Sequence, residues 1–93
     1  MLERVIEKYL IKKVSESHGM CIKMESSSMS GLPDRLCILP GNKVFFVELK
    51  APGKKPRALQ KIVISHLKDL ECRVYVADSK ELVNKILEEN LKC

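Results

Sequence analysis

Asp34, Glu48 and Lys50 are the residues of this 93-residue chain whose types and spacing could do chemistry together. Asp34 follows Pro33, thirteen residues separate it from Glu48, and Lys50 comes two positions later. Carboxylate oxygens are ligands that Mg²⁺ prefers, and a neighbouring lysine can contact a water or a phosphate oxygen. This set is what a magnesium-dependent phosphodiester hydrolase needs. Taken singly, Pro-Asp is also a common turn and Glu-x-Lys a common ion pair.

The segment that carries Glu48 and Lys50 predicts a strand. Residues 43–50, Lys-Val-Phe-Phe-Val-Glu-Leu-Lys, are mostly β-branched and aromatic. Alternation puts Glu48 and Lys50 on one face, roughly 7 Å apart along it. That face also carries Val44 and Phe46, while the other carries Phe45, Val47 and Leu49. A strand that is apolar on both faces is normally central and buried, so a carboxylate and an ammonium at its end call for a functional reason.

A hairpin is expected to bring Asp34 to the same place. Pro40-Gly41-Asn42 predicts a tight turn between a strand over 35–39 and the strand over 43–50. Asp34 and Glu48 stand at similar distances from this turn along its two arms. Antiparallel pairing should therefore let both carboxylates reach one ion, with Lys50 on the same face.

The remaining periodicity predicts three helices and two further strands. Apolar spacing and end signals place helices over 2–17, 56–71 and from Asp78 or Ser79 to about 90, and strands over 20–24 and 73–77. Gly19 is expected to take the left-handed conformation after the first helix. The crossover from strand 43–50 to strand 73–77 is long enough to make those two strands parallel. We therefore expect one α/β domain over 1–93, a small mixed sheet flanked by helices in the order αβββαβα.

The helix over 56–71 matters because it follows the candidate lysine. Its apolar spacing predicts an inward stripe made of Leu59, Ile62, Val63, His66, Leu67 and Leu70. Gln60 lies one position off this stripe, which by periodicity alone makes it a solvent-facing residue.

Charge points to a polyanionic partner. The formal net charge is +5, and the segment from Lys50 to Lys61 contains no acidic residue. Its other basic residues could track a phosphate backbone beside the cleavage centre: Lys54, Lys55, Arg57 and Lys61. The same run would also suit a solvated loop. With few aromatic residues, base stacking is not expected to supply the affinity.

Composition gives the expected compartment. No apolar run approaches the ~20 residues of a membrane span, and the N-terminus does not resemble a signal peptide. We expect a soluble, cytoplasmic protein with no membrane partner. Four cysteines, at positions 21, 37, 72 and 93, are expected to be reduced thiols, three of them core fillers. Their spacing relative to His18 and His66 matches no known zinc pattern.

Two motifs and a downstream glutamine carry a resemblance to a known family. Gly31-Leu32-Pro33-Asp34-Arg35 and Val44-Phe45-Phe46-Val47-Glu48-Leu49-Lys50 are followed by Gln60 near the start of the next helix and by the strand from Arg73 to Val76. The chain resembles the PD-(D/E)xK nuclease superfamily and, within it, the virus-type replication-repair nuclease (VRR-NUC) family. The resemblance covers essentially the whole chain and implies a restriction-endonuclease-like core.

The resemblance also implies roles for individual residues. Asp34, Glu48 and the carbonyl of Leu49 would ligate one or two divalent ions, Lys50 would be the catalytic lysine, and Gln60 would position the lysine or a water. The family places a further glutamate of the first helix near the metal. Glu7 is favoured over Glu3 because it lies one turn deeper in the helix.

The function implied by the resemblance is a structure-selective endodeoxyribonuclease that depends on Mg²⁺, with Mn²⁺ able to substitute, and needs no small-molecule cofactor. Small members resemble enzymes that cut four-way DNA junctions. A homodimer is the natural inference because two symmetric sites match a junction. A virus or prophage could encode such a protein. Two alternatives stay open: a non-catalytic nucleic-acid-binding module that retains the fold, and a small interaction protein that uses its basic face.

Overall fold

The computed structural model describes residues 1–92, so Cys93 lies outside the described residues. Helix α1 (Glu3–Glu16) leads into strand β1 (Met20–Lys23), and a long loop connects it to β2 (Arg35–Leu39) and β3 (Lys43–Leu49). Helix α2 (Ala58–Asp69), strand β4 (Val74–Ala77) and helix α3 (Lys80–Leu91) complete the chain. The αβββαβα order confirms the predicted α/β fold class.

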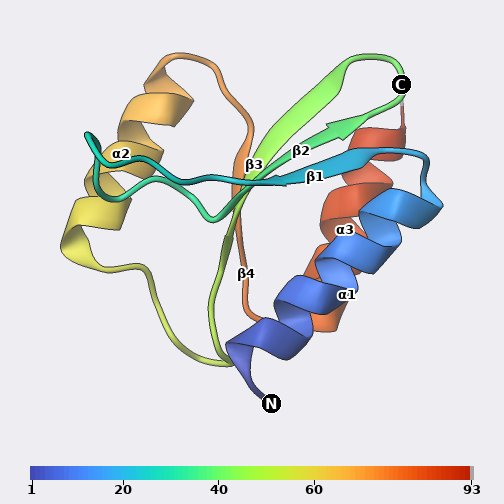
Figure 1. Ribbon diagram of the computed structural model, residues 1–93, viewed down its shortest axis with the longest axis horizontal. Coiled ribbons are helices and arrows are strands. Elements are labelled where there is room, and N and C mark those ends of the chain that lie inside the picture. Colours follow the sequence, from blue (N-terminus) through green and yellow to red (C-terminus); the bar gives the residue numbers. More distant parts are fainter. Residues whose placement is uncertain (93) are drawn as a thin grey trace.

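The four strands form one mixed sheet in the order β1-β2-β3-β4. β1, β2 and β3 pair antiparallel, and β4 lies parallel to β3, as the length of the crossover predicted. Helices α1 and α3 cover one face of this sheet and α2 lies on the other (Figure 1). β3 is therefore a central strand, which explains its apolar sequence.

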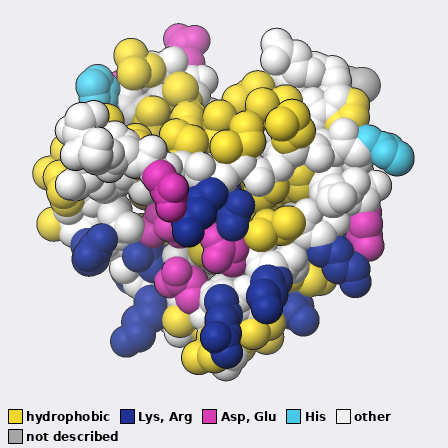
Figure 2. All heavy atoms as spheres, in the orientation of Figure 1, with side chains coloured by type: hydrophobic (Ala, Val, Ile, Leu, Met, Phe, Trp, Pro, Cys, Tyr) yellow, Lys and Arg dark blue, Asp and Glu magenta, His cyan; other side chains and the backbone are white. Residues whose placement is uncertain are grey.

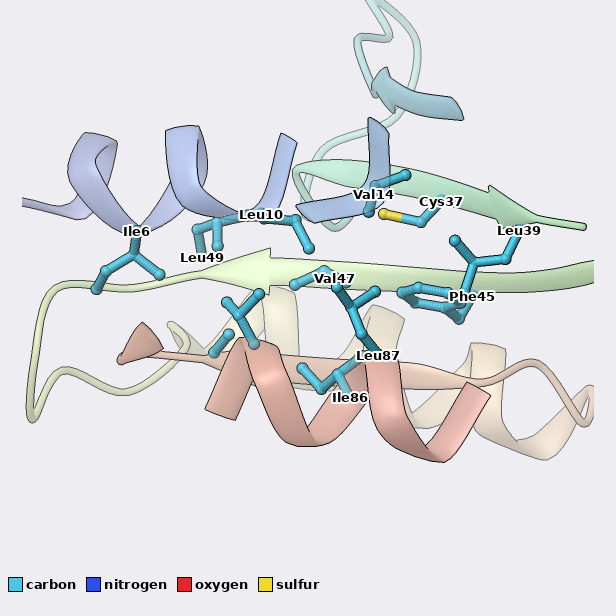
Figure 3. Close-up of a cluster of buried hydrophobic side chains, with 12 residues drawn as sticks. Ile6, Leu10, Val14, Cys37, Leu39, Phe45, Val47, Leu49, Ile86 and Leu87 are labelled. Atoms are coloured by element: carbon cyan, nitrogen blue, oxygen red, sulfur yellow. The ribbon is translucent and has the colours of Figure 1, made fainter. Parts of the chain in front are cut away.

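The core fills the space between the sheet and the pair of helices α1 and α3. Figure 3 shows apolar side chains of both helices directed at one face of β2 and β3, from Ile6, Leu10, Val14, Ile86 and Leu87 onto Cys37, Leu39, Phe45, Val47 and Leu49. Burial of this face fixes the register, because a slip by one residue would turn every core side chain of β3 to the other side.

The face under α2 is less completely covered. Even-numbered residues of the strands point to this side, and Met20 is 61% exposed there. Ile22 and Val44 are exposed as well. Apolar side chains gather over this part of the sheet in Figure 2. Charged and amide side chains occupy the same face near the end of β3, where the candidate site lies.

Two sequence expectations about helices are wrong. The residue in the left-handed conformation after α1 is His18, with φ of 63°, and not Gly19. Gly19 is needed for close approach instead, since a Cβ there would lie 2.5 Å from the carbonyl oxygen of Ile38. The stripe predicted for α2 is also out of phase, because its buried residues are Gln60, Val63 and Ile64, while Ile62 is 66% exposed. His66, Leu59 and Leu70 point outward too.

Of the cysteines in the described part of the chain, only Cys37 is a core residue. Cys21 is half-buried and packs against the core, while Cys72 is half-buried and lies outside the core cluster, so the expectation of three core fillers is only partly met. Among residues 1–92 there is no helix with the length and apolarity that a bilayer crossing requires.

Candidate active site

The hairpin register brings Asp34 and Glu48 face to face. Arg35 pairs with Val47 in the β2–β3 ladder, and one further step puts Asp34 opposite Glu48. Side chains alternate along each strand, so both carboxylates leave the sheet on the α2 side, away from the face of the apolar core. Directly opposed side chains have Cβ atoms about 5 Å apart. The predicted convergence of the two carboxylates on one face is therefore present in the fold.

Asp34 is held between both of its neighbouring strands. Its carboxylate oxygen Oδ2 accepts a hydrogen bond from the backbone N–H of Leu49 at 2.8 Å. Its backbone carbonyl accepts another from the N–H of Met24, just beyond β1, at 2.9 Å. These two bonds fix the main chain and the side chain of Asp34 at the point where β2 begins.

Pro33 leaves the backbone carbonyl of Leu49 without a hydrogen-bond donor in the ladder. The N–H of Leu49 points toward β2, and in an antiparallel ladder the carbonyl of the same residue points to the same side. The residue opposite Leu49, by continuation of the register, is Pro33, which has no N–H to donate. The ladder therefore leaves the carbonyl oxygen of Leu49 without a donor, on the side where the Asp34 carboxylate lies.

Glu48 is buried, with 1% of its surface exposed, and its two oxygens differ. Oε2 lies 3.1 Å from Nζ of Lys50 and accepts a hydrogen bond of 2.7 Å from Nε2 of Gln60. Oε1 is buried and has no hydrogen-bond partner among the described residues. A buried acceptor without a partner is costly and rare, and a bound ion or water is the usual reason for one.

The surroundings of Glu48 also shift the pKa of its carboxyl group. Burial raises the pKa of its carboxyl group, and the negative charge of Asp34 adds to the rise. The hydrogen bond and charge of Lys50, together with the bond from Gln60, act in the opposite direction. A cation beside Oε1 would favour the ionised form, so this carboxylate is one that a metal ion would stabilise.

Gln60 has both ends of its amide group occupied. Its Oε1 accepts from the backbone N–H of Arg57 at 2.9 Å, at the start of α2, while its Nε2 donates to Glu48. It is only 6% exposed, so the solvent-facing orientation suggested by helical periodicity is wrong. Helix α2 thus places the side chain of Gln60 against Glu48, while its other buried residues, Val63 and Ile64, are apolar.

Glu7 is engaged elsewhere. Its Oε2 lies 3.0 Å from Nε of Arg35, whose side chain belongs to the same sheet face as Val47. Within residues 1–92, no three His, Cys, Asp or Glu side chains are grouped so that they could hold a metal ion. The structure therefore brings Asp34 and Glu48 together without Glu7 as a third clustered ligand, and a metal role for Glu7 stays a prediction. Glu3 is exposed in the first turn of α1.

The basic residues follow the site along the chain. Lys54, Lys55 and Arg57 are exposed on the connection from β3 to α2, and Lys61 is exposed on α2. A hydrogen bond of 3.1 Å from the N–H of Gly53 to Oδ2 of Asp78 anchors this connection to the end of β4. The sequence offered Asp78 or Ser79 as the start of the last helix, and it is Ser79 that caps α3, accepting a hydrogen bond from the N–H of Leu82 at 3.1 Å. Figure 2 shows acidic side chains near the centre of this view with Lys and Arg side chains around them.

The group as a whole has a definite chemical capacity. Two carboxylates and a main-chain carbonyl supply hard oxygen ligands, a lysine supplies positive charge, and an amide orients one carboxylate. The contributions of Pro33 and of the Arg57 N–H were not predicted. The proline of the Pro33-Asp34 dipeptide was the available signal for the first, since it cannot donate to a ladder.

Comparison with known proteins identifies the family, although no protein-family model matches the chain. The chain is similar to a solved structure described as "VRR_NUC domain", with a TM-score of 0.87 and 30% identity over 92% of this chain and 94% of that one. It is also 42% identical over 80 residues to "Putative nuclease p44" of Acyrthosiphon pisum secondary endosymbiont phage 1, and this alignment covers 86% of each protein. On this shared fold and sequence, the chain belongs to the VRR-NUC family of nucleases.

Proposed function

We propose that this nuclease is a Mg²⁺-dependent endodeoxyribonuclease, with Mn²⁺ able to replace Mg²⁺, and that it cuts branched DNA such as four-way junctions as a homodimer. The observation that carries the metal-dependent activity is the buried, unpaired Oε1 of Glu48 beside Asp34 and Lys50. Asp34, Glu48 and the carbonyl of Leu49 would hold the ion. When bound, Mg²⁺ would lower the pKa of a coordinated water and offset negative charge on the phosphate.

Hydrogen bonds from neighbouring residues hold the carboxylates of Glu48 and Asp34 in place before an ion would bind. Lys50 and Gln60 both bond to Oε2 of Glu48, which leaves Oε1 as the free oxygen and fixes the carboxylate plane. The Leu49 N–H holds Oδ2 of Asp34, so that carboxylate does not have to be ordered when a ligand arrives. Preorganised groups of this kind lower the free energy of charge development in the transition state.

Lys50 is also proposed to interact with the substrate or the attacking water. Its ammonium group is largely shielded from solvent, with 14% of the side chain exposed. Positive charge in such a site interacts more strongly with an anion than it would in water. We assign Lys50 to the phosphate oxygens or to the attacking water, where it offsets the negative charge that builds up during hydrolysis.

A cleavage assay on labelled four-way junction, flap and linear duplex DNA tests this proposal. Cutting is expected with Mg²⁺ or Mn²⁺, most rapidly on the junction, and none is expected with EDTA. DNA retention in every condition without cutting would select the non-catalytic binding module. Absence of both binding and cutting would select the interaction protein. Equal cutting of all three DNAs would keep the nuclease and reject the preference for branches.

The basic connection after β3 is proposed to track phosphates. Lys54→Ala and Arg57→Ala are each expected to weaken DNA binding severalfold, equally for all sequences. Each should also reduce the slope of log K against log salt by about one unit, because each removes about one phosphate contact. Binding measured over a salt series checks this. Lys85→Ala on α3, an exposed lysine on the opposite side of the sheet, serves as the control. An unchanged slope for both variants would contradict the assignment.

The homodimer is proposed to form at β1. This strand is the edge of the sheet opposite β4, and Met20 and Ile22 are exposed on it. Helix α3, whose sequence is also apolar on one side, already buries its residues Val83 and Ile86 within the chain. An edge strand with exposed apolar side chains is suited to pairing with another copy.

Sedimentation of the purified protein checks the dimer. The unaltered chain is expected at twice the mass of one chain, and Met20→Lys combined with Ile22→Lys is expected at the monomer mass, because charged edge residues prevent strand pairing. Leu82→Lys, an exposed apolar position on α3, should leave the dimer intact. A monomeric unaltered chain would reject the homodimer, and a dimeric double variant would place the interface elsewhere.

A further inference from the structure

Cys21 and Cys37 form a thiol pair that the nuclease site does not use. They are directly paired across the β1–β2 ladder, and their sulfur atoms lie 3.8 Å apart, with the Cys37 S–H donating to Cys21 Sγ. Cys37 is completely buried beneath α1, whereas Cys21 on the edge strand is half-buried. In the single chain, Cys21 is therefore the thiol that solvent can reach, and Cys37 lies behind it in the core.

The position of the pair in the ladder suits a covalent link. The N–H of Met24 donates to the carbonyl of Asp34, so the even-numbered residues of β2 are the ones that bond to β1. Cys37 is odd-numbered, which makes Cys21–Cys37 a non-hydrogen-bonded pair with Cα atoms about 4.5 Å apart. Disulfides span Cα separations of about 4.4–6.8 Å, so the sulfur atoms can close to about 2.05 Å without movement of the strands.

The surroundings make the two thiols unequal. The hydrogen bond from Cys37 lowers the pKa of Cys21, burial opposes this, and the positive charge of Arg35 lowers it further against the raising effect of Glu7. The guanidinium Nη1 of Arg35 donates to the Cys21 carbonyl at 3.4 Å, which keeps that charge close. The pKa of Cys37 is raised by its hydrogen bond to Cys21 and by burial. Cys21 is thus the more acidic thiol of the pair, and Cys37 is the one that holds its proton more tightly.

We propose that Cys21 and Cys37 are a reversible redox modification site that closes to an intramolecular disulfide on exposure to a hydroperoxide. With hydrogen peroxide as the oxidant, the Cys21 thiolate attacks one peroxide oxygen, and an S–O bond forms as the O–O bond breaks; the hydroxide that leaves takes up the proton released on ionisation of the thiol, giving a sulfenic acid and one water. The Cys37 thiol then attacks that sulfur, and an S–S bond forms as the S–O bond breaks, with release of a second water. Two electrons pass from the thiols to the peroxide, and a dithiol reductant reverses the change.

The link would join the edge strand to the strand that leads from Asp34. The segment it closes, residues 21–37, includes the exposed Ser-rich loop and Asp34 itself. This inference goes beyond the proposed nuclease function and does not depend on it, since it rests on the two sulfur atoms and their strands alone.

The test uses a Cys72→Ser/Cys93→Ser background, so that Cys21 and Cys37 are the only thiols. The folded protein is treated with hydrogen peroxide, the peroxide is removed, and free thiols are counted after denaturation. We expect loss of both thiols, a mass decrease of about 2 Da for the two hydrogens, a monomer on denaturing gels, and full recovery with dithiothreitol. Retention of both thiols, addition of oxygen without a bridge, or a link between two chains would overturn the proposal.

Cys21→Ser in the same background is the matched control. It removes the half-buried member of the pair, whereas Cys37→Ser would place a hydroxyl group in the core. The control should show no mass decrease, and its remaining thiol should survive the peroxide treatment. If Cys37 alone were oxidised as fast as the pair, the assignment of Cys21 as the attacking thiol would be wrong.

Discussion

Lys50→Ala is expected to lower the cleavage rate by about 10²–10³-fold while DNA binding changes little. The substitution removes the ammonium group 3.1 Å from Glu48 and leaves the carboxylates and the exposed basic connection in place. Single-turnover cleavage of junction DNA at saturating enzyme checks the rate, because it isolates the chemical step from binding and product release. A gel-shift assay in Ca²⁺ or EDTA checks the affinity.

The matched control for this experiment is Lys54→Ala. Both variants lose one positive charge, but Lys54 is an exposed residue of the connection and Lys50 is shielded next to Glu48. Lys54→Ala is expected to lose affinity while keeping its rate at saturation, the reverse of the result for Lys50→Ala. If both variants lost affinity and neither lost rate, Lys50 would contribute only to binding of the DNA and not to the chemical step.

Glu48→Gln is expected to abolish cleavage and, in metal-free solution, to raise the melting temperature by a few degrees. The glutamine keeps a carbonyl oxygen for Lys50 and Gln60 and removes a buried negative charge next to Asp34. A buried charge that is not fully compensated lowers the stability of the fold, and proteins retain such groups where function requires them. Melting curves in EDTA, with and without added Mg²⁺, test both parts. Added Mg²⁺ should stabilise the unaltered chain and not the variant.

The pH dependence of these melting curves has a definite sign. Burial raises the pKa of Glu48 above its ordinary value of 4.5, so the folded state holds this proton more tightly than the unfolded state. The stability from this group is fully present below pH 4.5 and is lost as the pH rises through the folded pKa. Glu48→Gln cannot titrate, so its stability should lack this decline.

Asp34→Asn supplies the comparison for Glu48→Gln. Its side-chain oxygen can still accept the Leu49 N–H, and it too is expected to lose cleavage. It should keep a smaller decline in stability as the pH rises through the Glu48 titration, because Glu48 is still present but the negative charge of Asp34, which adds to the raised pKa, is gone. Asp34→Ala and Glu48→Ala should bind DNA as tightly as the unaltered chain or more tightly, since each removes negative charge that faces the phosphates. An unchanged pH profile for Glu48→Gln would contradict the burial argument.

The carboxylate pair could be predicted from the sequence because short-range rules decide it. The Pro40-Gly41-Asn42 turn fixes the register of β2 on β3, and the period of two along each strand fixes the face of Asp34 and Glu48. Both rules act over a few residues, so no information from distant parts of the chain was needed.

Helix α2 could not be oriented from its own sequence. It carries apolar residues on two sides, with Ile62 on the exposed side and Val63 and Ile64 on the buried one, so periodicity alone could not choose. The sheet surface it packs on makes the choice, and Gln60 is turned inward as a result. Only the family resemblance predicted that position.

The pairing of Cys21 with Cys37 could not be predicted from the sequence, for a different reason. The register of β1 on β2 is set across the long connection from Lys23 to Arg35, not by a tight turn. A connection of this length allows several registers, and burial of Cys37 on the core face selects the observed one. The partner of a residue on β1 therefore depends on tertiary packing.

The two hydrogen bonds of Asp34 have a mechanical consequence. Its carbonyl is tied to Met24 at the end of the edge strand, and its carboxylate is tied to Leu49 on the central strand. A displacement of the outermost strand would thus be transmitted through a single residue to an oxygen of the proposed metal site. Pairing of that edge with a second copy, as in the proposed homodimer, would therefore bear on the position of one proposed metal ligand, Asp34.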